Sequence, residues 1–326
     1  MVRRPPRSTL FPYTTLCRSC LDDHGHILLA ERIDADEKAI EDLSRQAKEQ
    51  PPLLAKMTKA RIKELKAEKR AADQFGTVYK KATRRLMDSL KDSIDQSSPE
   101  ALLSLPKDQL IELILSGGLA ESVEDFIDQQ DKMLEAINES LSIVEPTWTP
   151  LFIKTEVDSI RTLTVQNVFD DIVVPTVTKN VKESLLSMVV DTPPSLAISN
   201  LALTLEKGAG TLQTEVRTKI SQFGRSVNMI AADSVGLDHY LYTGPRDGIT
   251  RSFCRPLVDK VVDKTQLSKL NNGQGLSVRT SGGGYNCRHS WSPVTESFVK
   301  AAGLDKATAS DISKANTGGK LLRRQY

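Results

Sequence analysis

The chain lacks several features that would place it in a specialised class of protein. No apolar run approaches the roughly 20 residues that a membrane-spanning helix needs, so no membrane contact is expected. Its four cysteines include one Cys-x-x-Cys spacing, Cys17 and Cys20, of which Cys17 lies in an N-terminal segment that is excluded below. The absence of any other such spacing argues against a disulfide framework and favours a reducing compartment. Aromatic residues make up only 5% of the chain, which indicates that much of its length is plain helix.

The first 19 residues, MVRRPPRSTLFPYTTLCRS, resemble the translation of a common short-read sequencing adapter, with single changes at Val2 and Cys17. We therefore treat residues 1–19 as an artefactual segment outside the fold. The segment carries four arginines and no acidic residue, so its exclusion leaves 40 basic and 42 acidic residues. The net charge changes from +2 to −2. The charge balance then gives no support for nucleic-acid binding.

Helical patterns fill most of the chain up to residue 233. Pro51 and Pro52 separate two charged helices, expected at 31–50 and 53–95. The second of these is nearly devoid of apolar residues from Lys66 to Gln74, which predicts a solvated face, an extended arm or a partner contact. Further helices are expected at 98–105, 106–117, 119–143, 151–172 and 177–190, with a hinge at Pro146 and Pro150.

The strongest amphipathic pattern covers residues 211–233, after Gly208 and Gly210, and Gly236 is the expected end of that helix. Short strands are then expected at 238–242, 276–280 and 290–294. A helix at 295–315 and a basic tail at 320–326 follow.

These patterns predict an α+β fold. A predominantly helical N-terminal region with long helices precedes a small C-terminal α/β module with a short antiparallel sheet. The predicted division of the chain is an artefactual segment 1–19, an elongated helical region 20–145, a helical connecting region 146–210 and the module 211–326.

A cassette of uncommon residues lies within the predicted module. Its members are Asp247, Thr250, Arg251, Cys254, Gly284, Asn286, Cys287, Arg288, His289 and Pro293. Together with the helix before it, this cassette makes residues 211–294 resemble the phage head morphogenesis family, the Mu F-like minor head proteins. Two departures from the family pattern are Cys254, where many relatives have histidine, and His289, where many have cysteine.

The resemblance implies a minor capsid component that acts in head morphogenesis. Its implied partners are the portal protein and the inner capsid surface, within the virion and, during assembly, in the host cytoplasm. It implies no enzyme activity, no catalytic residues and no small-molecule substrate. One alternative is an internal virion protein that contacts packaged DNA. Another is a nuclease or toxin-like module that uses Arg251, Tyr285 and His289.

Three cassette side chains, Cys254, Cys287 and His289, are also candidate zinc ligands, with Asp247 or His239 as a fourth. The cysteines lie far apart in sequence rather than in the close pairs typical of structural zinc sites, so no cofactor is the favoured expectation. Two other states are a Cys254–Cys287 disulfide and a pair of partly buried thiols beside a hydrogen-bonded histidine.

The remaining cassette residues have structural and functional interpretations. Arg251 and Arg288 either contact phosphates or fix the turns of the module by pairing with Asp247 or Asp238. Glycines 282–284 predict a tight turn with positive φ rather than a phosphate-binding loop. Tyr285 and Trp291 are expected to be core or interface anchors.

Overall fold

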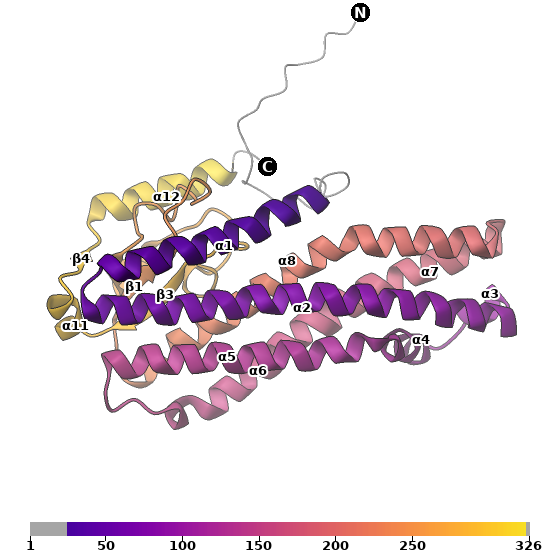
Figure 1. Ribbon diagram of the computed structural model, residues 1–326, viewed down its shortest axis with the longest axis horizontal. Coiled ribbons are helices and arrows are strands. Elements are labelled where there is room, and N and C mark those ends of the chain that lie inside the picture. The colour runs from indigo at the N-terminus through magenta and orange to yellow at the C-terminus, as the bar shows by residue number, and fades with distance from the viewer. Residues whose placement is uncertain (1–24, 324–326) are drawn as a thin grey trace, which may run out of the picture.

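A computed structural model describes residues 25–323 and shows a bundle of long helices with a small sheet-containing module at one end (Figure 1). The predicted α+β class is confirmed. The artefactual segment 1–19 lies outside the described residues. The central bundle helix is α2, Pro52–Gln96, and it packs against α1, α5 and α8. Those three helices are Gly25–Glu49, Ala120–Val144 and Pro194–Ser234.

Pro51 and Pro52 separate α1 from α2 as predicted, and Pro52 occupies the first turn of α2, where a missing N–H costs nothing. Of the alternatives predicted for Lys66–Gln74, the extended arm is wrong, although Lys66 and Arg70 lie on a solvated face. Ala67, Glu68 and Ala71 of this segment are buried. Alanines allow neighbouring helices to approach closely, so a sequence with few large apolar residues still forms a core face.

The short helices at the far end of the bundle follow the predicted capping signals. The Ser98 hydroxyl accepts a hydrogen bond from the backbone N–H of Ala101 at the start of α3, Pro99–Leu103. The next helix, α4 (Lys107–Ile114), continues into a π-helical turn η1, Leu115–Leu119. Gly118 adopts a φ of 103° there, which separates this turn from α5.

The predicted interruption near Pro175 is not a break in the helical path. A 3₁₀ turn η2 (Pro150–Ile153) leads into α6, Lys154–Val168. A π-helical turn η3 (Phe169–Val173) then joins α6 directly to α7, Val174–Val190. Pro175 lies in the first turn of α7, where its missing N–H is tolerated.

The predicted helix start at residue 211 is wrong, because α8 begins at Pro194 and runs through Gly208 and Gly210 without interruption. The predicted boundary between residues 210 and 211 therefore falls inside one helix. Two glycines cost roughly 1 kcal/mol each in a helix, and the buried residues on either side of them compensate for this. The predicted end is confirmed, with Gly236 at a φ of 70° just after Ser234.

The module contains a four-stranded sheet in the order β3-β1-β2-β4. Two strands of this sheet agree with predicted strands, β1 (His239–Thr243) and β3 (Ser290–Val294), and they pair antiparallel. The strand β2 (Lys260–Asp263) was not predicted, and it pairs antiparallel with β1. The sheet is mixed, because β4 (Asp305–Lys306) pairs parallel with β2.

Two other expectations for the module are wrong. Residues 276–280 form no strand, and a single helical turn α10, Val278–Ser281, lies there instead. The expected helix 295–315 is divided into α11 (Glu296–Ala301) and α12 (Ala309–Arg323), with β4 between them. Gly303, with a φ of 61°, makes this division possible. A further short helix α9, Lys264–Lys269, follows β2.

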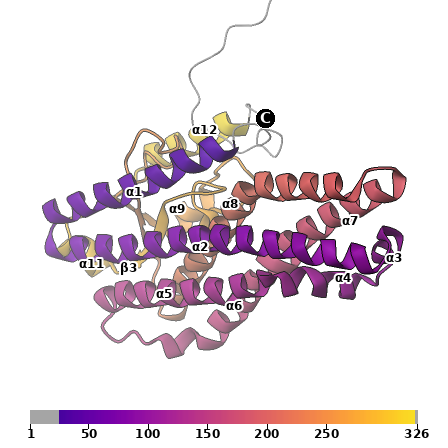
Figure 2. The same ribbon diagram turned by 45° about the vertical axis from the view of Figure 1, so that its right-hand side comes forward.

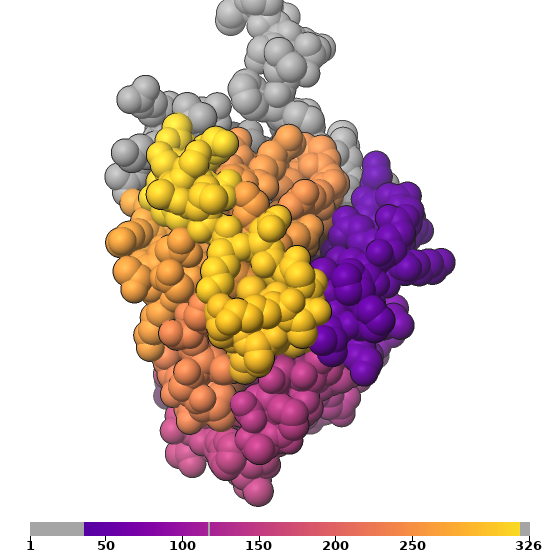
Figure 3. Space-filling model, turned by 90° about the vertical axis from the view of Figure 1, so that its left-hand side faces the viewer, coloured from indigo at the N-terminus to yellow at the C-terminus, as the bar shows by residue number. Residues whose placement is uncertain are grey.

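The bundle and the module have separate hydrophobic cores, but bundle helices contribute to both. Leu54 and Met57 of α2, Val144 of α5 and Met229 of α8 belong to the core of the module. Figures 2 and 3 show the module at the end of the bundle where these helices meet, flanked by α1 and the beginning of α2. Within residues 25–323, no helix combines the length and apolarity that a membrane crossing needs.

Candidate functional site

The first cassette loop, between β1 and β2, is held by Asp247. Its carboxylate accepts a hydrogen bond from the Thr250 hydroxyl at 2.9 Å and pairs with the Arg288 guanidinium at 2.7 and 2.8 Å. Burial raises the pKa of Asp247, but Arg288 and the Thr250 hydroxyl outweigh this effect and hold the pKa below its usual value. The predicted pairing of Arg288 with Asp247 is therefore present, and it joins the two halves of the cassette.

Arg251 holds the glycine-rich turn in the second half of the cassette. Its guanidinium donates to the carbonyl of Gly283 at 3.0 Å and to that of Tyr285 at 2.5 Å. The predicted positive φ is found at Gly282 (53°) and Gly284 (104°). Asn286 also adopts a left-handed conformation with a φ of 60°. Arg251 thus stabilises a turn whose positive φ angles most residue types other than glycine and asparagine would adopt only with strain.

Gly283 is required for a different reason, namely space beside the two cysteines. A Cβ atom at this position would lie 2.4 Å from the Cys254 sulfur and 3.3 Å from the Cys287 sulfur. Gly244 has the same relation to His289, because a Cβ there would lie 2.4 Å from the imidazole Cδ2 atom. The glycines of the cassette therefore surround Cys254, Cys287 and His289.

These three candidate ligands converge in the fold. The sulfur atoms of Cys254 and Cys287 are 3.9 Å apart, and the Cys287 sulfur is 3.8 Å from Nδ1 of His289. All three ligand atoms lie within 4.8 Å of one another, and all three residues are buried. Cys287 and His289 can converge because residues 287–289 are irregular backbone and β3 begins only at Ser290.

Tyr242, in the middle of the sheet, completes this cluster and was not predicted to belong to it. Its hydroxyl lies 3.4 Å from the Cys254 sulfur and 3.5 Å from the Cys287 sulfur. Its ring stacks on the imidazole of His289 with a centroid separation of 5.2 Å. Alternation in β1 directs Tyr242 and Tyr240 to the same face of the sheet, and this was the available sequence signal.

The two other proposed ligands are not part of the cluster. The side chain of His239 lies against Asp238 at 2.6 Å and Glu296 at 3.2 Å. Asp247 is engaged by Arg288 and Thr250. A Cys254–Cys287 disulfide is absent, since the sulfur separation of 3.9 Å is far above the roughly 2.05 Å of an S–S bond.

Burial affects the two thiols unequally. Burial and the neighbouring Cys287 sulfur raise the pKa of the Cys254 thiol well above its usual range. Burial also opposes ionisation of Cys287, but its contacts with Cys254 and His289 outweigh this and hold the pKa of Cys287 well below its usual range. The cluster therefore favours a thiolate at Cys287, which also accepts a hydrogen bond from the backbone N–H of Gly283 at 3.2 Å.

Two buried arginines of the bundle bind the backbone of the same turn, and sequence analysis missed both. Arg225 of α8 donates to the carbonyls of Cys287 at 2.5 Å and His289 at 2.9 Å. Arg61 of α2 donates to the carbonyl of Arg288 at 2.9 Å. Three successive carbonyls of the cassette therefore accept hydrogen bonds from cations of the bundle.

Carboxylates of α2 balance these cations. Arg61 pairs with Glu64 at 2.6 Å and with Glu68 at 3.0 Å, and all three side chains are buried. Burial raises the pKa of Glu68, but the charges of Arg61, Arg225 and Arg217 outweigh it and lower the pKa below its usual value. The spacing of charges at i, i+3 and i+7 along the alanine face of α2 was the signal that could have revealed this network.

The predicted anchor role of Trp291 agrees with its position in β3. Trp291 is fully buried, packs on Tyr242 with a ring centroid separation of 4.1 Å, and donates its indole N–H to the carbonyl of Val278 at 2.9 Å. Pro293 also belongs to β3, where it lies opposite Tyr240 of β1. Since β3 is an edge strand, the missing N–H of proline is tolerated there. Tyr285, by contrast, is only half-buried.

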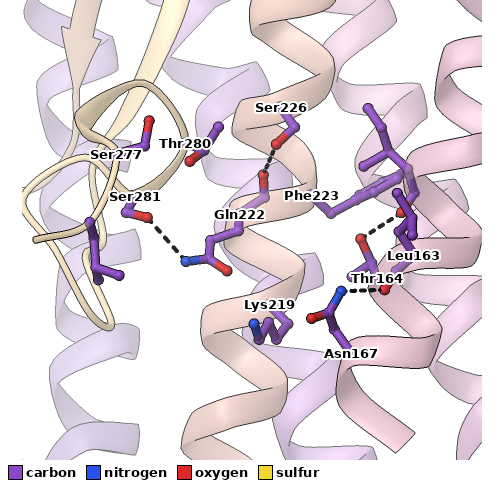
Figure 4. A pocket seen from close by; sticks show the side chains of 12 residues that line it. Leu163, Thr164, Asn167, Lys219, Gln222, Phe223, Ser226, Ser277, Thr280 and Ser281 are labelled. Carbon is purple, nitrogen blue, oxygen red and sulfur yellow. Dashed lines mark hydrogen bonds between the residues drawn. The ribbon is translucent and has the colours of Figure 1, made fainter. Parts of the chain in front are cut away.

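A surface pocket of about 320 Å³ lies between α6, α8 and the segment 276–281 (Figure 4). Gln222 of α8 donates to the Ser281 hydroxyl across it at 3.0 Å, and Lys219 is its one charged lining residue. Its lining contains no histidine, cysteine or carboxylate, so it offers no acid–base pair for catalysis.

The residues of the nuclease hypothesis do not form an open site. His289 is 2% exposed, and its ring nitrogens lie against the Cys287 sulfur and the Pro245 carbonyl. Arg251 is engaged by two backbone carbonyls. A substrate would have to displace these internal contacts to reach either side chain.

Comparison of the chain with protein-family models, with curated proteins and with solved structures found no match.

Proposed function

We propose that this chain is a minor head protein of a bacteriophage, which acts in head morphogenesis by docking on the portal protein and the inner capsid surface. The proposal rests on the cassette resemblance and on one structural observation: most residues of the cassette are buried and contact one another. Thr250, Cys254, Cys287 and His289 are each at most 5% exposed. Their polar groups contact one another and the bundle, as expected for residues that stabilise a module.

The surface of the bundle supports an assembly role. Exposed large hydrophobic side chains within the described residues all fall between positions 151 and 203, outside the module. Several surround the α7–α8 turn, at the end of the bundle opposite the module (Figure 1). Val190 is 75% exposed and Leu196 is 52% exposed. Clustered apolar surface of this kind marks sites of protein–protein contact, and we assign the portal and capsid contact to it.

Co-expression with the portal and capsid proteins of the same phage tests this function. We expect the wild-type chain to co-purify with procapsids, as measured by immunoblot of gradient-purified particles. The double variant Val190→Asp/Leu196→Asp should be depleted from the particles, because it places charges on the docking surface. The control Lys179→Asp changes an exposed side chain of α7 outside that apolar set and should be incorporated normally.

Absence of the wild-type chain from procapsids would refute the proposal. Normal incorporation of the double variant would instead reject the α7–α8 turn as the docking surface. Packaged DNA is the alternative partner, and it predicts DNA binding by the isolated chain that weakens steeply with added salt.

A further inference from the structure

We infer that Cys254, Cys287 and His289 bind a structural zinc ion, with the hydroxyl of Tyr242 at the fourth apex. This inference does not depend on the proposed phage function, because it concerns the composition of the folded chain. It follows from the positions of the ligand atoms, the orientation of the histidine, the shape of the surrounding backbone and the charge of the site.

Four of the six separations among the proposed ligand atoms are already close to tetrahedral values. Zinc–sulfur bonds of about 2.3 Å and zinc–nitrogen bonds of about 2.0 Å place the ligand atoms of a tetrahedron roughly 3.5–3.8 Å apart. The observed separations are 3.9 Å between the sulfurs of Cys254 and Cys287 and 3.8 Å between Cys287 and His289. The Tyr242 hydroxyl is 3.4 and 3.5 Å from the two sulfurs. The Cys254 sulfur and Nδ1 of His289 lie within 4.8 Å of each other, so side-chain movement must bring them closer for both to reach one ion.

The histidine is oriented as a ligand. Its Nε2 atom lies 3.0 Å from the carbonyl of Pro245, and since a carbonyl only accepts hydrogen bonds, Nε2 carries the proton. Nδ1 then presents its lone pair to the sulfurs. Metal-binding histidines usually donate their second N–H to a carbonyl or carboxylate in this way, which fixes the tautomer. Stacking on Tyr242 holds the ring in this orientation.

The surrounding backbone supports bound thiolates. Gly283 donates its N–H to the Cys287 sulfur at 3.2 Å, and its missing side chain leaves the space in which both sulfurs lie. Arg225 and Arg61 fix the carbonyls of residues 287–289 from the bundle side. Both ligands of the second half of the cassette are therefore positioned before an ion binds.

The charge of the site and its polarizable sulfur ligands favour zinc over other divalent cations. Zinc binds both cysteines as thiolates, and the two thiolates neutralise a divalent cation in a fully buried site. Two sulfurs and an imidazole nitrogen suit zinc, whereas calcium and magnesium require oxygen ligands. Burial of every ligand is typical of a structural rather than a catalytic zinc site, because a catalytic ion needs a position open to substrate.

Elemental analysis of the full chain tests the inference. After purification at neutral pH from zinc-supplemented medium, without chelator, we expect about one zinc ion per chain. Cys287→Ser and His289→Gln should each reduce bound zinc by about tenfold or more. The control His239→Gln, at a histidine of the same module outside the cluster, should retain it. Cobalt in place of zinc should give the absorption of a tetrahedral thiolate complex.

Measurements on the wild-type chain decide the question even if a ligand variant does not fold. A bound ion predicts that a strong chelator lowers the thermal unfolding temperature, and that added zinc restores it. A zinc-free wild-type chain that takes up no zinc under reducing conditions would overturn the inference. Detection of a Cys254–Cys287 disulfide by mass spectrometry after alkylation of free thiols would also overturn it.

Discussion

Replacement of Arg225 by methionine tests whether the bundle holds the cassette in place. Arg225 is 2% exposed and lies within α8, and its guanidinium binds the carbonyls of Cys287 and His289. Methionine keeps most of the aliphatic volume but removes the charge and every donor. The variant therefore isolates the polar interactions of Arg225 from its packing.

The magnitude follows from the groups that lose their partner. Each buried carbonyl left without a donor costs about 1–3 kcal/mol. The carboxylates of Glu64 and Glu68 also lose a neighbouring cation, but both keep their ion pairs with Arg61, so this adds little to the loss. Partial relaxation and water entry reduce the sum, so we expect a loss of about 4 kcal/mol, a large fraction of the stability of a typical domain.

Urea denaturation followed by far-UV circular dichroism measures this loss. The matched control is Arg279→Met, since Arg279 is an arginine of the module that forms an exposed ion pair with Asp233 of α8 at 3.0 Å. We expect the control to change the free energy of unfolding by less than about 1 kcal/mol. Arg225→Lys should fall between the two, because it keeps the charge but not the fork that reaches two carbonyls. Equal stability of the Arg225→Met and Arg279→Met variants would refute the reasoning.

Two further predictions concern a pair of glycines and one carboxylate. Gly283→Ala should lower stability by about 1–3 kcal/mol, because its methyl group would overlap the Cys254 sulfur. Gly208→Ala, in open space within α8, should raise stability by about 0.5–1 kcal/mol, and denaturation of both variants compares them. Hydrogen bonds from Lys260 and the Thr308 backbone lower the pKa of Asp311 to about 2. The stability that Asp311 contributes should therefore be present above pH 4 and lost as the pH falls toward 2. The difference in thermal unfolding temperature between wild type and Asp311→Asn should shrink over that range, and a constant difference would contradict the assignment.

The helical part of the fold was largely predictable, since its boundaries depend on local signals. Pro51, Pro52 and Ser98 act within one turn of the residues they affect, and the helices begin where these residues predict. Gly208 and Gly210 were misleading because their helix-breaking tendency is small compared with the packing of α8 against α2. Local propensity therefore failed where a long helix is held by its neighbours.

Short strands were harder to predict, because four residues carry little periodicity. The segment Lys260–Asp263 contains only two apolar residues, and it forms β2 because β1 supplies a pairing edge. Residues 276–280 carry a similar density of apolar and β-branched residues but pair with no strand, and they form a loop and a helical turn. The difference lies in tertiary context, which the segment itself does not encode.

Sequence analysis identified the cysteines and the histidine of the cluster from their rarity, but it could not reveal what surrounds them. Arg61 lies 227 positions from Arg288, whose carbonyl it binds. Such a pairing has no local signature, because a buried arginine and an exposed one look alike in a charged helix. The available cue was the placement of Arg61, Glu64 and Glu68 on the alanine face of α2.

The buried charges explain why the bundle and the module form one unit despite their separate cores. Glu64 and Glu68 of α2 require cations within the interface, and Arg61 and Arg225 meet that need while their remaining donors bind the cassette. A cassette that moved away from the bundle would leave both arginines with unused donors and its own carbonyls without partners. Each side therefore depends on the other for hydrogen bonding, and displacement of the cassette is coupled to disruption of the ionic network in α2 and α8.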